Sequence, residues 1–246
     1  MLKAMTGVRG AVRSLTSSAG RNATPKVAPL QEAALEEQCI LVDESDKPIG
    51  HASKRNCHKI NDNKDIPLHR AFSVFLFDGK GNLLLQKRSA SKITFPGYYT
   101  NTCCSHPLIE VSGESEERDA LGVRRAARRR LAYELGIPTN EIELDEFFYL
   151  TRIHYQASGH DDIWGEHEID YVLFLQKNNV TLDPNMDEVS EIKWVSKSKI
   201  NEFVSKCNSP LTPWFELILN HKLSLWWDNL KCLEKVQDHK TIQRFM

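Results

Sequence analysis

The sequence lacks the features that mark several large classes of protein. No stretch of its 246 residues approaches the roughly 18 to 20 apolar residues of a membrane-spanning helix, so we predict no membrane partner. The formal net charge is only −1, which leaves no long-range field to attract nucleic acid. We therefore expect no nucleic-acid partner, and an anionic ligand would have to be bound by charges gathered locally.

Paired cysteines and the apolar core of a secretory signal are also lacking. The six cysteines form no Cys-x-x-Cys pair, which favours reduced thiols over a disulfide framework or a cysteine zinc site. They are Cys39, Cys57, Cys103, Cys104, Cys207 and Cys232.

Acidic residues are absent from positions 1–31, where basic residues are mixed with many Ser, Thr and Ala. This composition is typical of mitochondrial transit peptides, so we predict a transit segment over residues 1–31. The alternative is a basic tail without a targeting role, in a peroxisomal or cytosolic protein. The C-terminal residues Gln-Arg-Phe-Met differ from the Ser-Lys-Leu ending of peroxisomal proteins.

What is present indicates one globular unit, with 41% hydrophobic and 26% charged residues. Apolar runs predict strands over residues 39–43, 71–77, 83–88, 147–155, 169–175 and 191–195. The second and third are expected to form a hairpin around the Gly-rich segment 78–82. Helical spacing of apolar residues predicts a helix over 114–135, ended by Gly136 and Pro138, and further helices follow residue 196. We therefore expect an α/β (α+β) fold in which a mixed β-sheet lies between α-helices.

Two carboxylates occur in Glu166-His-Glu168, beside a predicted strand on which residues two apart share a face. A solvated acidic edge would explain this pair alone. Three histidines, His58, His69 and His106, also lie beside predicted strands or turns. Together these five side chains would make a mixed nitrogen and oxygen site for a divalent ion, and the sequence does not choose among Mg²⁺, Mn²⁺ and Zn²⁺.

The segment Thr-Asn-Thr-Cys-Cys-Ser-His-Pro at 100–107 places two adjacent cysteines just before His106. Adjacent cysteines are poorly placed for a relaxed disulfide, so a free thiol is expected, and we interpret Cys103 as a small buried apolar residue. Basic residues that could bind a diphosphate occur in several segments: Lys54, Arg88, Lys92 and Arg130. Any one of them could instead belong to a solvated face.

Four segments together resemble type I isopentenyl-diphosphate isomerases: residues 68–75, 95–97, 99–107 and 164–170. The resemblance covers residues 36–235, with a Nudix-like core at about 67–218, and leaves 236–246 as a C-terminal tail. It implies a Nudix-like mixed β-sheet sandwiched between α-helices, with added C-terminal helices. It also implies conversion of isopentenyl diphosphate to dimethylallyl diphosphate in isoprenoid and sterol biosynthesis, by a monomer.

The segment at 129–137 resembles a degenerate Nudix helix. In Nudix hydrolases the pattern Arg-Glu-x-x-Glu-Glu holds the metal that activates water, whereas Arg130 and Tyr133 replace two of those glutamates and only Glu134 remains. Water activation is therefore not expected, and a pyrophosphohydrolase is the second candidate function. The third is a metal- or diphosphate-binding module without catalysis.

Carried over to this sequence, the resemblance implies Cys104 as the catalytic thiol, Glu168 as the opposing acid or base, and Tyr155 as its assistant. It implies His58, His69, His106, Glu166 and Glu168 as metal ligands. It implies Lys54, Arg88, Lys92 and Ser105 as substrate-binding residues, with Arg130 as an addition. Glu134 is expected to help hold a second Mg²⁺ that arrives with the diphosphate. The implied reaction passes through a carbocation-like state, which an aromatic ring could stabilise. Trp214 and Trp194 are the candidates, and packing in the core is an equal alternative for both.

Overall fold

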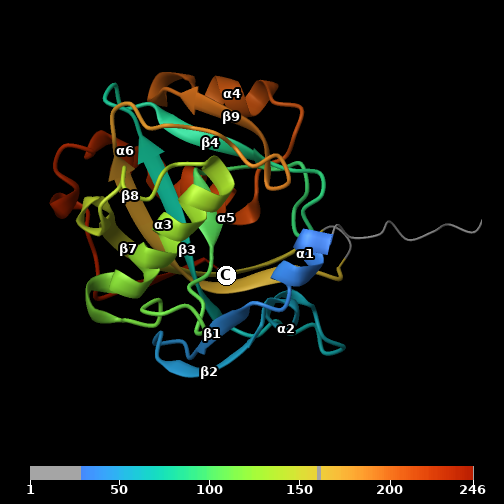
Figure 1. The fold of residues 1–246 in the computed structure, drawn as a ribbon. Helices are drawn as coiled ribbons and strands as arrows, with labels where there is room; N and C mark the ends of the chain where they lie inside the picture. Colours follow the sequence, from blue (N-terminus) through green and yellow to red (C-terminus); the bar gives the residue numbers. More distant parts are fainter. Residues whose placement is uncertain (1–28, 160–161, 246) are drawn as a thin grey trace, which may run out of the picture.

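The computed structural model describes residues 29–159 and 162–245, and these form a sheet with helices on both faces (Figure 1). The strands are β1 Gln38–Val42, β2 Pro48–Ser53, β3 His69–Phe77, β4 Leu83–Arg88, β5 Tyr99–Thr100, β6 Cys103–Ser105, β7 Phe148–Ser158, β8 Gly165–Gln176, β9 Val189–Val195 and β10 Ile242–Phe245. The α-helices are α1 Pro29–Ala34, α2 Lys54–His58, α3 Leu121–Leu135, α4 Ile200–Lys206, α5 Pro213–Ile218 and α6 Ser224–Asp228. The predicted mixed sheet between helices is confirmed.

Strand β3 is the centre of the sheet, and all of its residues are buried. It runs parallel to β8 and antiparallel to β1 and β6. A continuous apolar sequence suits such a strand, because both of its faces are covered by other elements.

The predicted hairpin of β3 and β4 forms only at its tip, where Phe77 pairs with Leu83. Beyond that pair the strands separate, because β6 occupies the edge of β3 while β4 pairs with β5 and β9. Because β6 takes this edge, Cys104 lies beside β3, opposite Ser73.

Two apolar cores lie on the two faces of the sheet. Helix α3 covers one face, where Val123, Ala127 and Leu131 pack against strand residues such as Phe72. Helices α5 and α6 cover the other face with Phe215 and the tryptophans of the C-terminal segment. The C-terminal tryptophans therefore belong to the core, and Trp214 also borders the pocket described below.

The predicted helix over 114–135 begins later than expected, at Leu121. Residues before it form turns and one 3-10 turn, in which Asp119 and Ala120 have positive φ values. Glu114 does not start a helix but is buried, where it accepts a hydrogen bond from the Leu108 amide and pairs with Arg129. The first residues of the predicted helix thus belong to the turns that precede it.

The folded part extends beyond both expected domain limits. Helix α1 lies within the segment expected to precede the domain, and β10 lies within the expected C-terminal tail. Strand β10 joins the main sheet in parallel pairing with β7, in which Phe245 faces Tyr155. Most of the predicted transit segment, residues 1–28, lies outside the described residues. Among the described residues, no helix is long and apolar enough to cross a membrane.

Candidate active site

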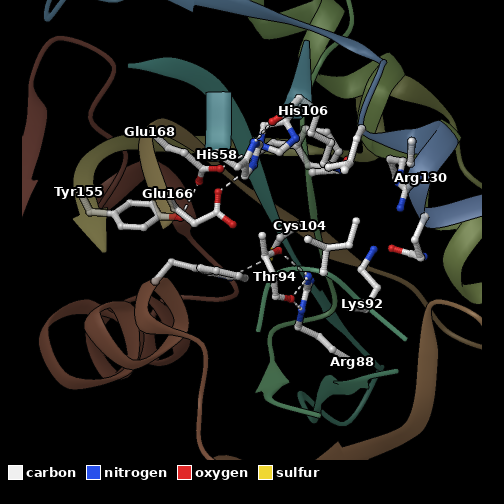
Figure 2. Close-up of a pocket in the computed structure, with 18 residues that line it drawn as sticks. His58, Arg88, Lys92, Thr94, Cys104, His106, Arg130, Tyr155, Glu166 and Glu168 are labelled. Atoms are coloured by element: carbon white, nitrogen blue, oxygen red, sulfur yellow. Dashed lines mark hydrogen bonds and ion pairs between the residues drawn. The ribbon is translucent and has the colours of Figure 1, made fainter. Parts of the chain in front are cut away.

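The sheet brings most of the predicted functional residues to one pocket. Strands β6 and β8 flank β3 on opposite sides, so that Cys104 pairs with Ser73 and Glu168 pairs with His69. Helix α2 adds His58 at its last position. Figure 2 shows the histidines and glutamates at one end of this pocket, Lys92 and Arg130 at the other, and Cys104 between them.

Five side chains form the cluster that the sequence predicted as a metal site. They are His58, His69, His106, Glu166 and Glu168. All are buried, and one ligand atom from each lies within 4.8 Å of those of the others. The closest approaches are 2.9 Å from His58 Nε2 to Glu166 Oε2 and 2.9 Å from His106 Nε2 to Glu168 Oε1.

The imidazole orientations in this cluster fit a bound cation. His58 Nδ1 lies 2.7 Å from the Lys54 carbonyl oxygen, and His69 Nδ1 lies 2.9 Å from that of Pro67. A carbonyl oxygen only accepts, so each Nδ1 carries a hydrogen, and in the neutral imidazole each Nε2 then directs a lone pair at a carboxylate. Both His69 Nε2 and Glu166 Oε2 are buried without a hydrogen-bond partner. A positive ion between these converging lone pairs would satisfy them without a proton on His69 or Glu166.

The pKa values in the cluster show that protons would have to balance its charges without an ion, since, although burial opposes this, contact with Glu168 raises the pKa of His69 to about 9. Burial, and then the charge of Glu168, raise the pKa of Glu166 to about 8. Burial also lowers the pKa of His106 to about 3 and lowers that of His58. A divalent ion would favour ionised carboxylates and neutral imidazoles together, which makes this donor set suitable for one.

Cys104 lies at the pocket wall among polar side chains. Its sulfur is 3.0 Å from Trp214 Nε1, 3.0 Å from Asn101 Oδ1 and 3.5 Å from Ser73 Oγ. Burial, and then the charge of Asp170, raise the pKa of the Cys104 thiol to about 12. At neutral pH it therefore carries a proton that can be given to a ligand.

Glu168 has a partner on each side. One oxygen contacts His106, and the other accepts a 2.5 Å hydrogen bond from the Tyr155 hydroxyl. Burial raises the pKa of Tyr155, so this hydroxyl is a donor at neutral pH. The carboxylate is thereby fixed in orientation toward the pocket that both residues line.

The opposite end of the pocket is cationic and is organised by Glu188. This carboxylate lies 2.5 Å from Lys92 Nζ and 3.3 Å from Arg130 Nη2. Burial opposes its ionisation, but the charges of Lys92 and Arg130 lower the pKa of Glu188 to about 2. Arg88 is held separately by the Thr94 carbonyl oxygen at 2.8 Å. Lys54 and Ser105 complete the polar lining.

Comparison with known proteins gives close relatives along nearly the whole chain. A protein of Mesocricetus auratus named isopentenyl-diphosphate Delta-isomerase 1 is 55% identical over 87% of this chain and 94% of its own length. A chloroplastic isopentenyl-diphosphate Delta-isomerase 1 of Cannabis sativa is 45% identical over 94% of this chain and 83% of its own length. The family model of the NUDIX domain matches residues 67–215. The chain belongs to the isopentenyl-diphosphate Delta-isomerase family.

The fold of this family member agrees with the NUDIX assignment. The crystal structure of DR0079 from Deinococcus radiodurans matches with a TM-score of 0.50 and 18% identity, over 76% of this chain and 99% of that one. The family resemblance and the Nudix-like fold inferred from the sequence are both confirmed. On the helix where a Nudix hydrolase gathers carboxylates, Arg130 and Glu134 instead form an ion pair of 2.6 Å.

All of the predicted site residues except His69 and Glu134 line the pocket. Glu134 lies apart from the five-residue cluster and is bound by Arg130, Gln86 and Cys103. Cys103 is fully buried in the core, as interpreted from the sequence. Of the two tryptophans left open, Trp214 lines the pocket, whereas Trp194 is part of another groove and is 36% exposed.

Sequence reasoning missed four residues in the surroundings of the site: Gln31, Asn101, Asp170 and Glu188. Asn101 and Asp170 lie inside the recognised motifs and could have been selected as buried polar neighbours of Cys104 and Glu168. Gln31 and Glu188 come from segments without a recognisable pattern, and only the fold brings them together, with Gln31 Nε2 2.9 Å from Glu188 Oε1.

Proposed function

We propose that this chain interconverts isopentenyl diphosphate and dimethylallyl diphosphate by moving protons between Cys104, the substrate and Glu168. The observation that carries the proposal is that these two residues line one pocket from strands on opposite sides of β3. The relatives' names support the reaction. The position of both residues in segments that resemble the isomerase family supports the roles.

The reaction adds a proton at C4 of an unactivated alkene and removes one from C2, so it needs an acid and a base that act at different carbons. In the proposed assignment, one of Cys104 and Glu168 gives a proton and the other takes one. Tyr155 assists by holding Glu168 through its hydroxyl. The carbocation-like state must be kept from water, and the ring of Trp214 supplies π density beside Cys104.

The diphosphate is proposed to bind at the cationic end of the pocket. Lys54, Arg88, Lys92, Ser105 and Arg130 all line that pocket. Guanidinium and ammonium groups from different segments suit the diphosphate, because its charge is distributed over several oxygens. Glu188 would hold Lys92 and Arg130 in place before the substrate arrives.

The five-residue cluster is proposed to hold one divalent ion, which could be Mg²⁺, Mn²⁺ or Zn²⁺. When bound, the ion would supply positive charge that keeps Glu166 and Glu168 ionised and fixes their orientation. Glu134 is proposed as a ligand of a second Mg²⁺ that arrives with the diphosphate. It would then have to exchange part of its pairing with Arg130 for the ion.

The proposal is tested by incubating the chain with isopentenyl diphosphate and Mg²⁺ in deuterated water and identifying the products by NMR. Dimethylallyl diphosphate with deuterium in a methyl group is expected, and the activity should be lost on chelation and in Cys104→Ala. Release of inorganic phosphate would instead identify a pyrophosphohydrolase. Unchanged substrate with a full metal content would identify a binding module.

We also propose that residues 1–31 direct the protein to mitochondria, that it acts as a monomer, and that its product enters isoprenoid and sterol synthesis. Fusion of this segment to a fluorescent protein tests the targeting, and mitochondrial fluorescence is expected. Peroxisomal or cytosolic fluorescence would contradict it. Light scattering of the purified chain tests the monomer. Some relatives carry a chloroplast address in their names, so the destination differs within the family.

A further inference from the structure

Asn101 is a fully buried amide whose orientation is fixed by the backbone. Its Nδ2 donates to the Val74 carbonyl oxygen at 2.9 Å and to that of Cys103 at 3.4 Å. Carbonyl oxygens only accept, so the nitrogen of the amide must face them. The amide oxygen therefore points in the opposite direction, toward Cys104.

That oxygen receives three donors. Asn101 Oδ1 lies 3.0 Å from Cys104 Sγ, 3.2 Å from Trp214 Nε1 and 3.0 Å from Thr100 Oγ1. The indole N–H only donates, and it also lies 3.0 Å from Cys104 Sγ. The thiol thus accepts from Trp214 and directs its own hydrogen toward Asn101.

We propose that Asn101 is a positioning residue that selects one rotamer of the Cys104 thiol and one orientation of the Trp214 ring. A cysteine side chain has three staggered wells, and the contacts with Asn101 and Trp214 favour one of them. Asn101 itself is not among the residues that line the pocket, so it acts through Cys104 and Trp214 and does not touch the substrate. The inference rests on the proposed role of Cys104 in proton transfer.

The test compares Asn101→Leu with Thr102→Val, a matched change in the same turn. Thr102 is equally buried and its hydroxyl joins the Leu76 amide to the Leu84 carbonyl oxygen, without a contact to Cys104. In Asn101→Leu we expect kcat to fall about a hundredfold, as a small misplacement of a reacting group can cause. KM and the Kd for inorganic diphosphate should stay within about twofold, since uniform binding is unchanged. Thr102→Val should lower the melting temperature and leave kcat near that of the unaltered chain.

Asn101→Asp is the rescue variant. A buried carboxylic acid can donate to the Val74 carbonyl oxygen and still offer an oxygen to Cys104 and Trp214, so its kcat should lie well above that of Asn101→Leu. If Asn101→Leu does not fold, Asn101→Ser replaces it, because serine removes the amide without adding bulk.

The inference is overturned if Asn101→Leu keeps kcat within about threefold, if KM rises in step with the loss, or if Thr102→Val is equally damaging. Equal losses in Asn101→Asp and Asn101→Leu would also contradict it. Failure of the proposed function looks different, because the unaltered chain would then release phosphate or leave the substrate unchanged, or Cys104→Ala would retain turnover. An inactive Cys104→Ala beside a fully active Asn101→Leu would remove only the positioning role.

Discussion

At the scale of single residues, Glu168 has two proposed roles, as a metal ligand and as an acid or base. Its one oxygen lies 2.9 Å from His106 and 3.5 Å from His69 in the proposed metal cluster, and its other oxygen receives the Tyr155 hydroxyl. Glu166, two positions earlier on the same face of β8, shares the cluster and contacts His58. A comparison of variants at the two glutamates can therefore distinguish an effect on metal binding from an effect on proton transfer.

In Glu168→Gln we expect kcat to fall by about a thousandfold, because an amide cannot exchange a proton as a carboxyl group does. The content of bound metal should fall as well, measured by elemental analysis of the purified variant. Glu166→Gln is the matched control. It loses a ligand but keeps the Tyr155 contact, so excess divalent ion should restore much of its activity and none of that of Glu168→Gln. An unchanged metal content in Glu168→Gln would remove this residue from the ligand set.

Lys92 gives the pocket a pH dependence. Burial, followed by the charge of Arg88, lowers the pKa of Lys92 from its usual value to about 8. As the pH rises through that value, the ammonium group loses the charge that would bind diphosphate. KM for isopentenyl diphosphate should therefore rise above pH 8, approaching about tenfold per pH unit for one coupled proton. Steady-state kinetics from pH 7 to 9.5 measure it, and Lys92→Arg should flatten the profile. A wild-type KM that does not change over this range would contradict the shift.

At the scale of elements, α1 covers the cationic end of the pocket. Gln31 is buried and donates to Glu188, the carboxylate that holds Lys92 and Arg130. Removal of α1 should loosen this arrangement, and hydrogen bonds to charged groups contribute about 1.5 to 3 kcal/mol, so KM should rise at least about tenfold. We predict this for a chain that begins at residue 36, with kcat nearly unchanged. A chain that begins at residue 29 is the control and should match the full chain, and equal KM values for the two would refute the role of α1.

The sequence identified those parts of the site that depend on local periodicity. Glu166 and Glu168 share a face because side chains alternate along a strand, and the segment containing Cys104 is recognisable as a motif. Long-range pairing was less accessible. The insertion of β6 beside β3 opens the expected hairpin, and the left-handed backbone of Ala120 delays the start of α3. Neither event leaves a signal in the apolar pattern, since both are decided by packing between segments distant in sequence.

At the scale of the whole molecule, the proposed metal cluster links β3, β8 and α2 to His106, the residue that follows β6. An ion that binds only the folded state at about a hundred times its Kd adds about 2.7 kcal/mol to the free energy of unfolding. For a chain of this size we expect the melting temperature to rise by about 5 to 10 °C. The rise should be larger at pH 7.5 than at pH 5.5, because protons compete with the ion for its ligands. Differential scanning calorimetry with and without a chelator measures it, and Glu166→Gln should show a much smaller rise.

The placement of Cys104 and Glu168 on opposite sides of β3 has a consequence for the catalytic cycle. In the proposed reaction one residue ends each conversion with a proton fewer and the other with a proton more. The protein that releases product is therefore a different tautomer from the one that bound substrate. It is ready for the reverse conversion, and a second forward conversion must wait until both protons have been exchanged. The burial that protects the carbocation also slows that proton exchange. For a time after product release, the protonation states of Cys104 and Glu168 therefore depend on the direction of the last conversion.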